Sequence, residues 1–158
     1  MVVFKLPKMT KQEMWKLIRR QRLCRIAFKG TKYPYMAPFQ YVVLDGGLYF
    51  HFTDYGKKMK LIENDKHVCV EIEEYKENLS EYKFIVLRGT LKVVTDNEER
   101  VGALKKLAEE GETKFSPNFL PAHGFNSEDG WVSLTSMEMP LLVVKLENIT
   151  QEIGLKSP

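Results

Sequence analysis

The spacing of apolar and polar residues predicts a chain made mainly of strands, with a few short helices between them. Near the start, Thr10 is followed three residues later by Glu13, which is the spacing of a helix capping box. Met14, Leu17 and Ile18 then recur on one helical face, with basic residues on the other. This pattern predicts an amphipathic helix over residues 11–20.

Runs of β-branched and aromatic residues, bounded by turn residues, predict strands. The segments with this character are 23–28, 35–44, 48–53, 67–75, 82–95 and 141–149. Asp45-Gly46-Gly47 is a turn signal that predicts a hairpin between the second and third strands. Gly89 interrupts the longest strand, which predicts a bulge or a close approach of another backbone.

Helical spacing returns over residues 57–64 and again after Asp96 or Asn97, where it predicts a helix that ends at Gly111. Residues 112–136 are irregular in pattern. Because the regular strand–helix alternation of a parallel sheet is absent, we expect a mainly β protein: one antiparallel barrel domain, residues 1–158, with peripheral helices.

Composition changes this picture little. Of the 158 residues, 44% are hydrophobic and 28% charged, which is globular composition, and the net charge is only +3. So small an excess argues against a nucleic-acid partner. No apolar run suits a membrane span or a signal peptide, so we expect a cytoplasmic protein. Cys24 and Cys69 predict two buried thiols, and the sequence offers no metal site.

The segment from His51 to Met59 is the strongest candidate for chemistry. A strand ends at Thr53, a glycine turn follows, and Lys57 and Lys58 begin a helix. Helix N-termini carry free N–H groups and partial positive charge, so lysines are unfavourable there unless an anion is near. The segment therefore predicts a phosphate site. The alternative is that Thr53 or Asp54 caps the helix and both lysines are solvated.

Six segments in this order resemble the FMN-binding split barrels of the pyridoxamine 5′-phosphate oxidase-like family, in its nitroimidazole-resistance branch. They are Leu23-Cys24-Arg25-Ile26-Ala27, Pro34-Tyr35-Met36-Ala37-Pro38-Phe39, Gly47-Leu48-Tyr49-Phe50-His51, Gly56-Lys57-Lys58-Met59-Lys60-Leu61, Val68-Cys69-Val70-Glu71-Ile72 and Val86-Leu87-Arg88-Gly89-Thr90. Residues 142–150 are similar to the closing strand of that family.

The resemblance implies a split antiparallel barrel that binds FMN. The residues that it places at the cofactor are Met36, Ala37, Pro38, Phe39, His51, Phe52, Thr53, Lys57 and Lys58. The backbone of residues 36–39 would run under the flavin ring, in a strand that Pro38 interrupts. His51 and Phe52 would flank the ring and ribityl chain, while Thr53, Lys57 and Lys58 would hold the phosphate. Without the resemblance, Pro38 is equally an edge-strand proline and His51 a packed strand residue.

The function that the resemblance implies is FMN-dependent oxidoreduction of an unknown substrate, with no catalytic side chain assigned. Residues 150–155 contain no arginine, unlike the substrate segment of pyridoxamine-phosphate oxidases, so that particular activity is not implied. The alternative is a non-catalytic protein that holds FMN, haem or the deazaflavin F420 for storage, sensing or electron transfer. Haem would take an axial ligand from His51, His67 or His123.

The resemblance also implies a homodimer with FMN at the subunit interface. The strands carry more large apolar residues than one barrel interior is expected to hold, which supports an apolar interface. Residues 112–136 contain an unusual number of aromatic and histidine side chains, namely Phe115, Phe119, His123, Phe125 and Trp131. These could cover the flavin site, or they could be ordinary packing in a monomer whose loop covers the exposed face.

Overall fold

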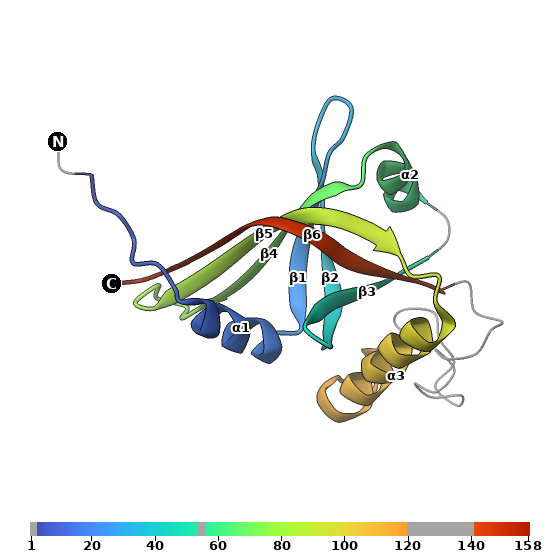
Figure 1. Ribbon diagram of the computed structural model, residues 1–158. Helices are drawn as coiled ribbons and strands as arrows, with labels where there is room; N and C mark the ends of the chain where they lie inside the picture. The colour runs from blue at the N-terminus through green and yellow to red at the C-terminus, as the bar shows by residue number, and fades with distance from the viewer. Residues whose placement is uncertain (1–2, 54–55, 120–140) are drawn as a thin grey trace.

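The structure is a computed structural model that describes residues 3–53, 56–119 and 141–158 (Figure 1). Its elements, in chain order, are α1 (Lys11–Arg20), β1 (Leu23–Phe28), β2 (Tyr35–Leu44), β3 (Gly47–Thr53), α2 (Lys57–Asn64), β4 (His67–Tyr75), β5 (Tyr82–Val93), α3 (Asn97–Lys114) and β6 (Leu141–Lys156). The predicted order of helices and strands is confirmed. No helix in these ranges is both long and apolar enough to cross a membrane.

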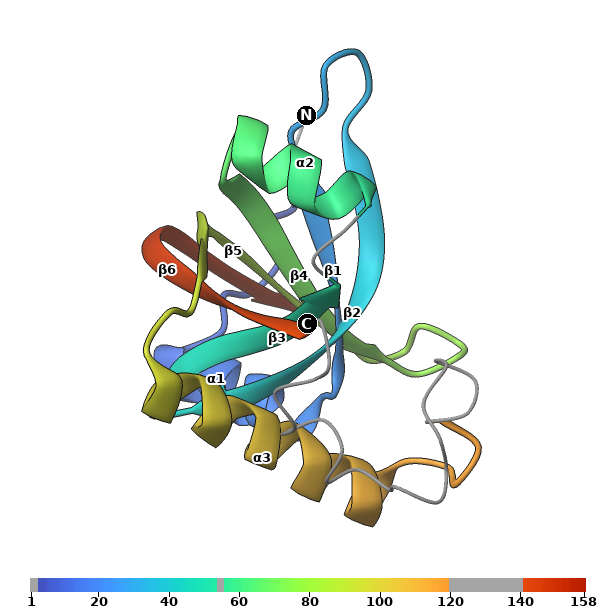
Figure 2. The same cartoon turned by 90° about the vertical axis from the view of Figure 1, so that its right-hand side faces the viewer.

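The six strands form a barrel in the order β1-β2-β3-β6-β5-β4, and every pair is antiparallel. The mainly β, antiparallel barrel expected from the sequence is therefore confirmed. α2 and α3 lie on opposite sides of the barrel (Figure 2). The capping box is also present, since the Thr10 side chain accepts from the Glu13 backbone and the Glu13 side chain accepts from the Thr10 backbone.

The barrel is split between β2 and β3. These strands pair only from Tyr41, opposite Phe50, to Leu44, opposite Gly47. From Tyr35 to Gln40, in the described part of the chain, β2 has β1 as its only strand neighbour. β3 meanwhile continues to Thr53 alongside β6. The two strands of the hairpin therefore separate beyond the Tyr41–Phe50 pair.

The predicted interruption at Pro38 is wrong, because β2 runs through Pro38, which lies opposite Arg25 in β1. Proline lacks an N–H, and it is tolerated in this part of β2 because only one side of the strand is paired there. The prediction at Gly89 is confirmed: the β5–β6 register shifts between Arg88 and Thr90, and a Cβ at Gly89 would lie 2.6 Å from the Glu147 carbonyl oxygen.

Four element boundaries differ from the prediction: β3 begins one residue earlier, at Gly47, β5 ends two residues earlier, at Val93, and α3 and β6 are both longer than expected. α3 continues past Gly111 to Lys114, because a glycine inside a helix costs only about 1 kcal/mol relative to alanine and Gly111 is buried here. β6 continues from residue 149 to Lys156, because β5 supplies backbone partners as far as Lys83, opposite Lys156. The polar sequence of this extension carries no strand pattern of its own.

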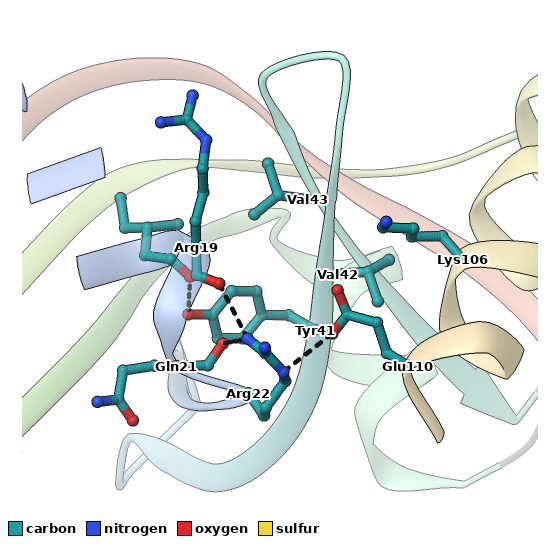
Figure 3. A pocket seen from close by; sticks show the side chains of 9 residues that line it. Arg19, Gln21, Arg22, Tyr41, Val42, Val43, Lys106 and Glu110 are labelled. Carbon is teal, nitrogen blue, oxygen red and sulfur yellow. Dashed lines mark hydrogen bonds and ion pairs between the residues drawn. The ribbon is translucent and has the colours of Figure 1, made fainter. Parts of the chain in front are cut away.

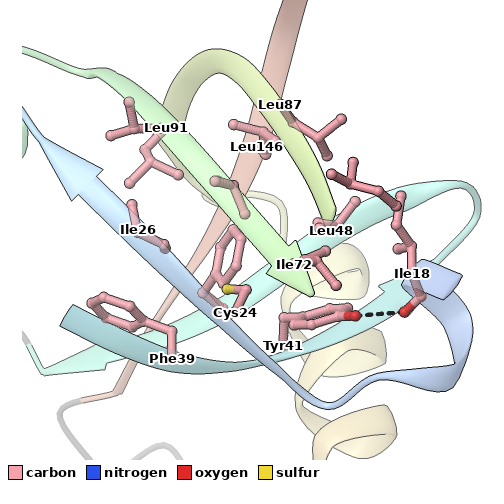
Figure 4. Close-up of a cluster of buried hydrophobic side chains, with 14 of the residues drawn as sticks. Ile18, Cys24, Ile26, Phe39, Tyr41, Leu48, Ile72, Leu87, Leu91 and Leu146 are labelled. Carbon is pink, nitrogen blue, oxygen red and sulfur yellow. Dashed lines mark hydrogen bonds between the residues drawn. The ribbon is translucent and has the colours of Figure 1, made fainter. Parts of the chain in front are cut away.

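The barrel interior is a cluster of buried aliphatic and aromatic side chains, closed at one end by α1 (Figure 4). Tyr41 belongs to this cluster, and its hydroxyl donates to the Ile18 carbonyl at 2.5 Å. A second cluster packs α3 against the outside of the barrel through Val42, Leu104, Leu107 and Val143. β2 is therefore buried on both faces at Tyr41 and Val42, where it begins to separate from β3, and this packing holds the strand in place.

The two cysteines lie in different environments. Cys24 is buried, and burial raises the pKa of its thiol. Cys69 is only half-buried, so the expectation of two buried thiols is wrong for this residue, which lies on the outer face of β4.

Three side chains join the ends of β1 and β4, and we call them the Asp65 cluster: Asp65, Lys29 and His67. The Asp65 carboxylate lies 3.0 Å from Lys29 Nζ and 2.7 Å from His67 Nδ1, and it accepts from the His67 backbone N–H at 3.0 Å. These hydrogen bonds, with that of the His67 backbone the strongest, hold the pKa of Asp65 well below its usual range.

Candidate functional site

The split between β2 and β3 forms a cavity of about 410 Å³, which we call the β2–β3 cavity. Its described lining residues are Arg22, Leu23, Pro38, Phe39, Gln40, His51, Phe52, Thr53, Lys58, Phe115, Phe119 and Leu141. Ligand sites in proteins are typically concavities of roughly 300–1,000 Å³ with mostly apolar walls and a few polar groups, and this cavity fits that description.

Six of the nine residues that the sequence assigned to a cofactor line this cavity: Pro38, Phe39, His51, Phe52, Thr53 and Lys58. The other three do not line it. Met36 is 64% exposed on the outer face of β2, Ala37 packs toward the barrel core, and Lys57 is exposed on α2. The structure therefore brings together both strand ends and one of the two lysines.

One end of the cavity is formed by the end of β3 and the start of α2. The N-cap residue of α2 is Gly56, whose φ of 100° is a backbone conformation that favours glycine, and as a glycine it offers no side chain to cap the helix. The cap is therefore not Thr53, which excludes one alternative drawn from the sequence; Asp54 lies outside the described residues. The first turn of α2 contains no acidic residue, so its N-terminal charge is not balanced from within the helix.

The two lysines of this turn lie in different places. Lys58 lines the cavity, with its Nζ 4.7 Å from the centre of the Phe39 ring, which also lines it. Lys57 Nζ lies 4.8 Å from the centre of the Tyr35 ring, which is not part of the lining. Of these two lysines, it is therefore Lys58 that carries its charge to the cavity wall.

Aromatic rings form much of the wall. Phe39 and Phe52 stack with ring centres 4.8 Å apart and planes 27° apart, and Phe39 also contacts Phe28 in the barrel core. Beyond the C-terminal end of α3, Phe115 and Phe119 pack together at 4.9 Å and line the cavity from outside the barrel. Two aromatic residues of the 112–136 segment thus lie at the candidate site; His123, Phe125 and Trp131 lie outside the described residues.

Arg22 is a lining residue that the sequence did not single out. Its Nη1 donates to the carbonyls of Arg19, Arg20 and Gln21, each at 2.9 Å, and so satisfies the C-terminal end of α1. Figure 3 shows Arg22 between Arg19, Gln21 and Glu110. Its Nε lies 3.2 Å from a Glu110 carboxylate oxygen on α3. Arg22 thereby links α1 to α3, beside a smaller cavity of about 230 Å³, and holds one wall of the β2–β3 cavity in place.

Gln40 is the second lining residue that the sequence missed. It is one of two buried polar residues in the described part of the chain, and it lies opposite Leu23 in the β1–β2 register. Neither its amide nitrogen nor its amide oxygen has a hydrogen-bond partner among the described residues. A lone glutamine within an apolar strand is the only sequence signal for it.

The charged side chains among the described lining residues are all cationic, and one of them, Arg22, is paired with Glu110 outside the lining. Arg22 and Lys58 are cationic, and no aspartate or glutamate is among the described lining residues. No group of three metal-ligating side chains is found within residues 3–53, 56–119 and 141–158. The arrangement therefore suits an anionic organic ligand with an aromatic or apolar body.

A larger hollow of about 650 Å³ lies over β1, β4 and β5, with Lys66 and Arg88 on its rim. It contains none of the nine residues assigned from the sequence, so the β2–β3 cavity remains the candidate site.

Solved structures of similar fold include flavin-binding proteins. A FAD-binding protein from Mesorhizobium loti is 20% identical with a TM-score of 0.70, covering 98% of this chain and 100% of that one. A candidate 5-nitroimidazole antibiotic resistance protein from Bacteroides thetaiotaomicron is 18% identical with a TM-score of 0.68, covering 96% and 87%. A FAD and heme binding protein from Mycobacterium smegmatis is 11% identical with a TM-score of 0.65, covering 94% and 71%. At these identities the likeness shows a common fold.

Comparison with curated proteins gives no significant match. The family model described as pyridoxamine 5′-phosphate oxidase matches residues 10–136, a range that includes α1, β1 to β5, α3 and all nine residues assigned from the sequence. Because that match spans most of the chain, this protein belongs to the pyridoxamine 5′-phosphate oxidase family.

Proposed function

We propose that this protein binds FMN in the β2–β3 cavity and acts as a flavin-dependent oxidoreductase. The observation that carries the proposal is the meeting, in one cavity, of a cationic helix start and an aromatic wall. Lys58 and the start of α2, whose first turn contains no acidic residue, supply positive charge at one end, while Phe39 and Phe52 supply an apolar surface. A phosphate ester of an aromatic ring system requires both features.

Different residues of the β2–β3 cavity would bind different parts of the ligand. Thr53 and Lys58 would hold the phosphate through a hydroxyl and a charge-assisted hydrogen bond. Phe39 and Phe52 would pack against the apolar part of the ligand, and Phe115 and Phe119 would limit access of water from outside. FMN, when bound, supplies hydride or single-electron transfer, and the protein supplies binding and orientation.

A second candidate is FAD, because three of the similar structures are named as FAD-binding proteins. One of them is also named as heme-binding, and His51 lines the cavity, so haem is a third ligand to test. FAD would supply the same redox chemistry as FMN, whereas a protein that only stores, senses or transfers electrons through FMN, haem or F420 would not turn over a substrate.

We propose further that a second copy of the chain completes the site. Leu23 lines the cavity and is 57% exposed, and Met36, on the neighbouring strand, is 64% exposed. Large apolar side chains beside a ligand cavity are suited to burial in an interface. Sedimentation at micromolar concentration tests this: we expect a dimer when FMN is bound, whereas a monomer that retains FMN would contradict a shared site.

Titration of cofactor-free protein with FMN, riboflavin, FAD and haem tests the ligand. We expect FMN to bind more tightly than riboflavin, because only FMN carries the phosphate that Thr53 and Lys58 would hold. Equal affinity for FMN and riboflavin would contradict the assignment of the phosphate site. Reduction of the bound flavin by NADH, NADPH or a reductase, and its reoxidation by an acceptor, would then separate an oxidoreductase from a storage protein.

A further inference from the structure

We propose that the Gln40 side-chain amide recognises an imide edge of the ligand ring, with its oxygen accepting from the ring N–H and its nitrogen donating to the adjacent ring carbonyl. This inference rests on the proposed flavin site and adds the orientation of the ligand within it. The pyrimidine end of a flavin ring carries such an edge, with an N–H between two carbonyls.

The burial of Gln40 and its lack of partners carry this inference. The residue is only 9% exposed, it lines the β2–β3 cavity, and both polar atoms of its amide are buried without a hydrogen bond among the described residues. Buried amides in native proteins are nearly always hydrogen-bonded, because the desolvation cost is otherwise uncompensated. A ligand that supplies one acceptor and one donor side by side would satisfy both atoms together.

The position of Gln40 in the split fits this role. Gln40 directly precedes Tyr41, which with Phe50 forms the last pair before β2 and β3 separate, so Gln40 lies at the closed end of the cavity. Thr53 is three residues beyond Phe50 on β3, which places it about 10 Å along the strand from that end. A ligand with its phosphate at Thr53 and Lys58 would therefore direct its ring toward Gln40.

The wall around Gln40 is held firmly enough to orient a ring. Gln40 lies opposite Leu23 on β1, and the neighbouring Arg22 is bound to the α1 carbonyls and to Glu110. Tyr41, the next residue along β2, is buried and hydrogen-bonded to Ile18. The backbone on both sides of the amide is thus packed.

The test compares FMN with FMN methylated at the ring imide nitrogen, for the wild type and for Gln40→Met. We expect methylation to weaken binding to the wild type by about tenfold, the scale of one or two lost hydrogen bonds. Gln40→Met should bind FMN about tenfold more weakly and should bind both forms equally. Lys58→Ala is the matched control: it should lose the preference for FMN over riboflavin and keep the preference against the methylated form.

The thermal stability of the cofactor-free Gln40→Met variant shows whether Gln40 recognises the ligand or stabilises the fold. Because the Gln40 amide has no hydrogen-bond partner among the described residues, Gln40→Met should leave the thermal midpoint of the empty protein unchanged or higher. A lower midpoint together with unchanged discrimination against methylated FMN would overturn the proposal. If Gln40→Met does not fold, Gln40→Glu serves the same purpose, because a carboxylate cannot donate to the ring carbonyl and should also weaken FMN binding. Failure of the wild type to bind FMN at all would instead overturn the proposed function, and this inference with it.

Discussion

Replacing Lys58 or Lys57 by alanine should have very different effects on FMN affinity, although the two lysines are adjacent and the sequence assigned both to the phosphate. The structure places only Lys58 in the lining of the β2–β3 cavity, while Lys57 lies over Tyr35 outside it. Comparing Lys57→Ala with Lys58→Ala therefore distinguishes a direct contact with the phosphate from the general effect of positive charge at the start of α2.

The expected magnitudes follow from these positions. A hydrogen bond between an ammonium group and a phosphate contributes about 1.5–3 kcal/mol, so Lys58→Ala should weaken FMN binding by about 10- to 150-fold. Lys57 acts only through a screened surface charge, which contributes about 0–1 kcal/mol, so Lys57→Ala should weaken binding by less than about fivefold. Neither substitution should change the affinity for riboflavin.

Titration of flavin fluorescence against cofactor-free protein measures all of these affinities, at low ionic strength and again at 0.15 M salt. Screening at the higher salt should reduce the small effect of Lys57→Ala further and leave most of the effect of Lys58→Ala. A loss for Lys57→Ala equal to or larger than that for Lys58→Ala would refute the placement of the phosphate, as would an equal loss of riboflavin affinity.

Three further substitutions test the fold by urea unfolding. Tyr41→Phe removes the buried hydrogen bond to Ile18 and should lower the free energy of unfolding by about 1–2 kcal/mol; an unchanged value would mean that this bond contributes nothing. Gly89→Ala should lower it by about 1–3 kcal/mol, because the new Cβ would lie 2.6 Å from the Glu147 carbonyl oxygen, and a neutral effect would contradict the tight bulge. Asp65→Asn should lower stability at pH 7. Because the Asp65 cluster depresses the pKa of Asp65 in the folded state, its charge stabilises the fold above the unfolded pKa of about 4, and the difference from the wild type should shrink as the pH falls below that value. A difference that stays constant down to pH 3 would contradict this origin.

The elements that the sequence predicted well are those with local signals. The capping box at Thr10 and Glu13 begins α1, and Asp45 and Gly46 both take the positive φ that a tight hairpin turn requires. The extension of β6 to Lys156 has no such signal, because it is a strand only through the partners that β5 offers. Its existence depends on tertiary pairing.

The candidate site, like the fold, was predictable only where its residues give a local sequence signal. The phosphate site at the glycine turn and lysines of α2 stays a prediction, and the sequence could not distinguish Lys57 from Lys58, because the direction of each side chain depends on how α2 packs. Gln40 was missed because its significance lies in its burial without a hydrogen-bond partner in the described part of the chain, which only the three-dimensional surroundings show. Arg22 was missed because its partners come from both α1 and α3.

The visible absorption spectrum of the purified protein, followed by the mass of the cofactor released on denaturation, identifies the ligand of the β2–β3 cavity. We expect a yellow protein with the two-peaked flavin spectrum and a released molecule with the mass of FMN. A single intense band near the violet with the mass of haem, or a colourless protein that takes up no flavin when FMN is added in excess, would contradict this expectation.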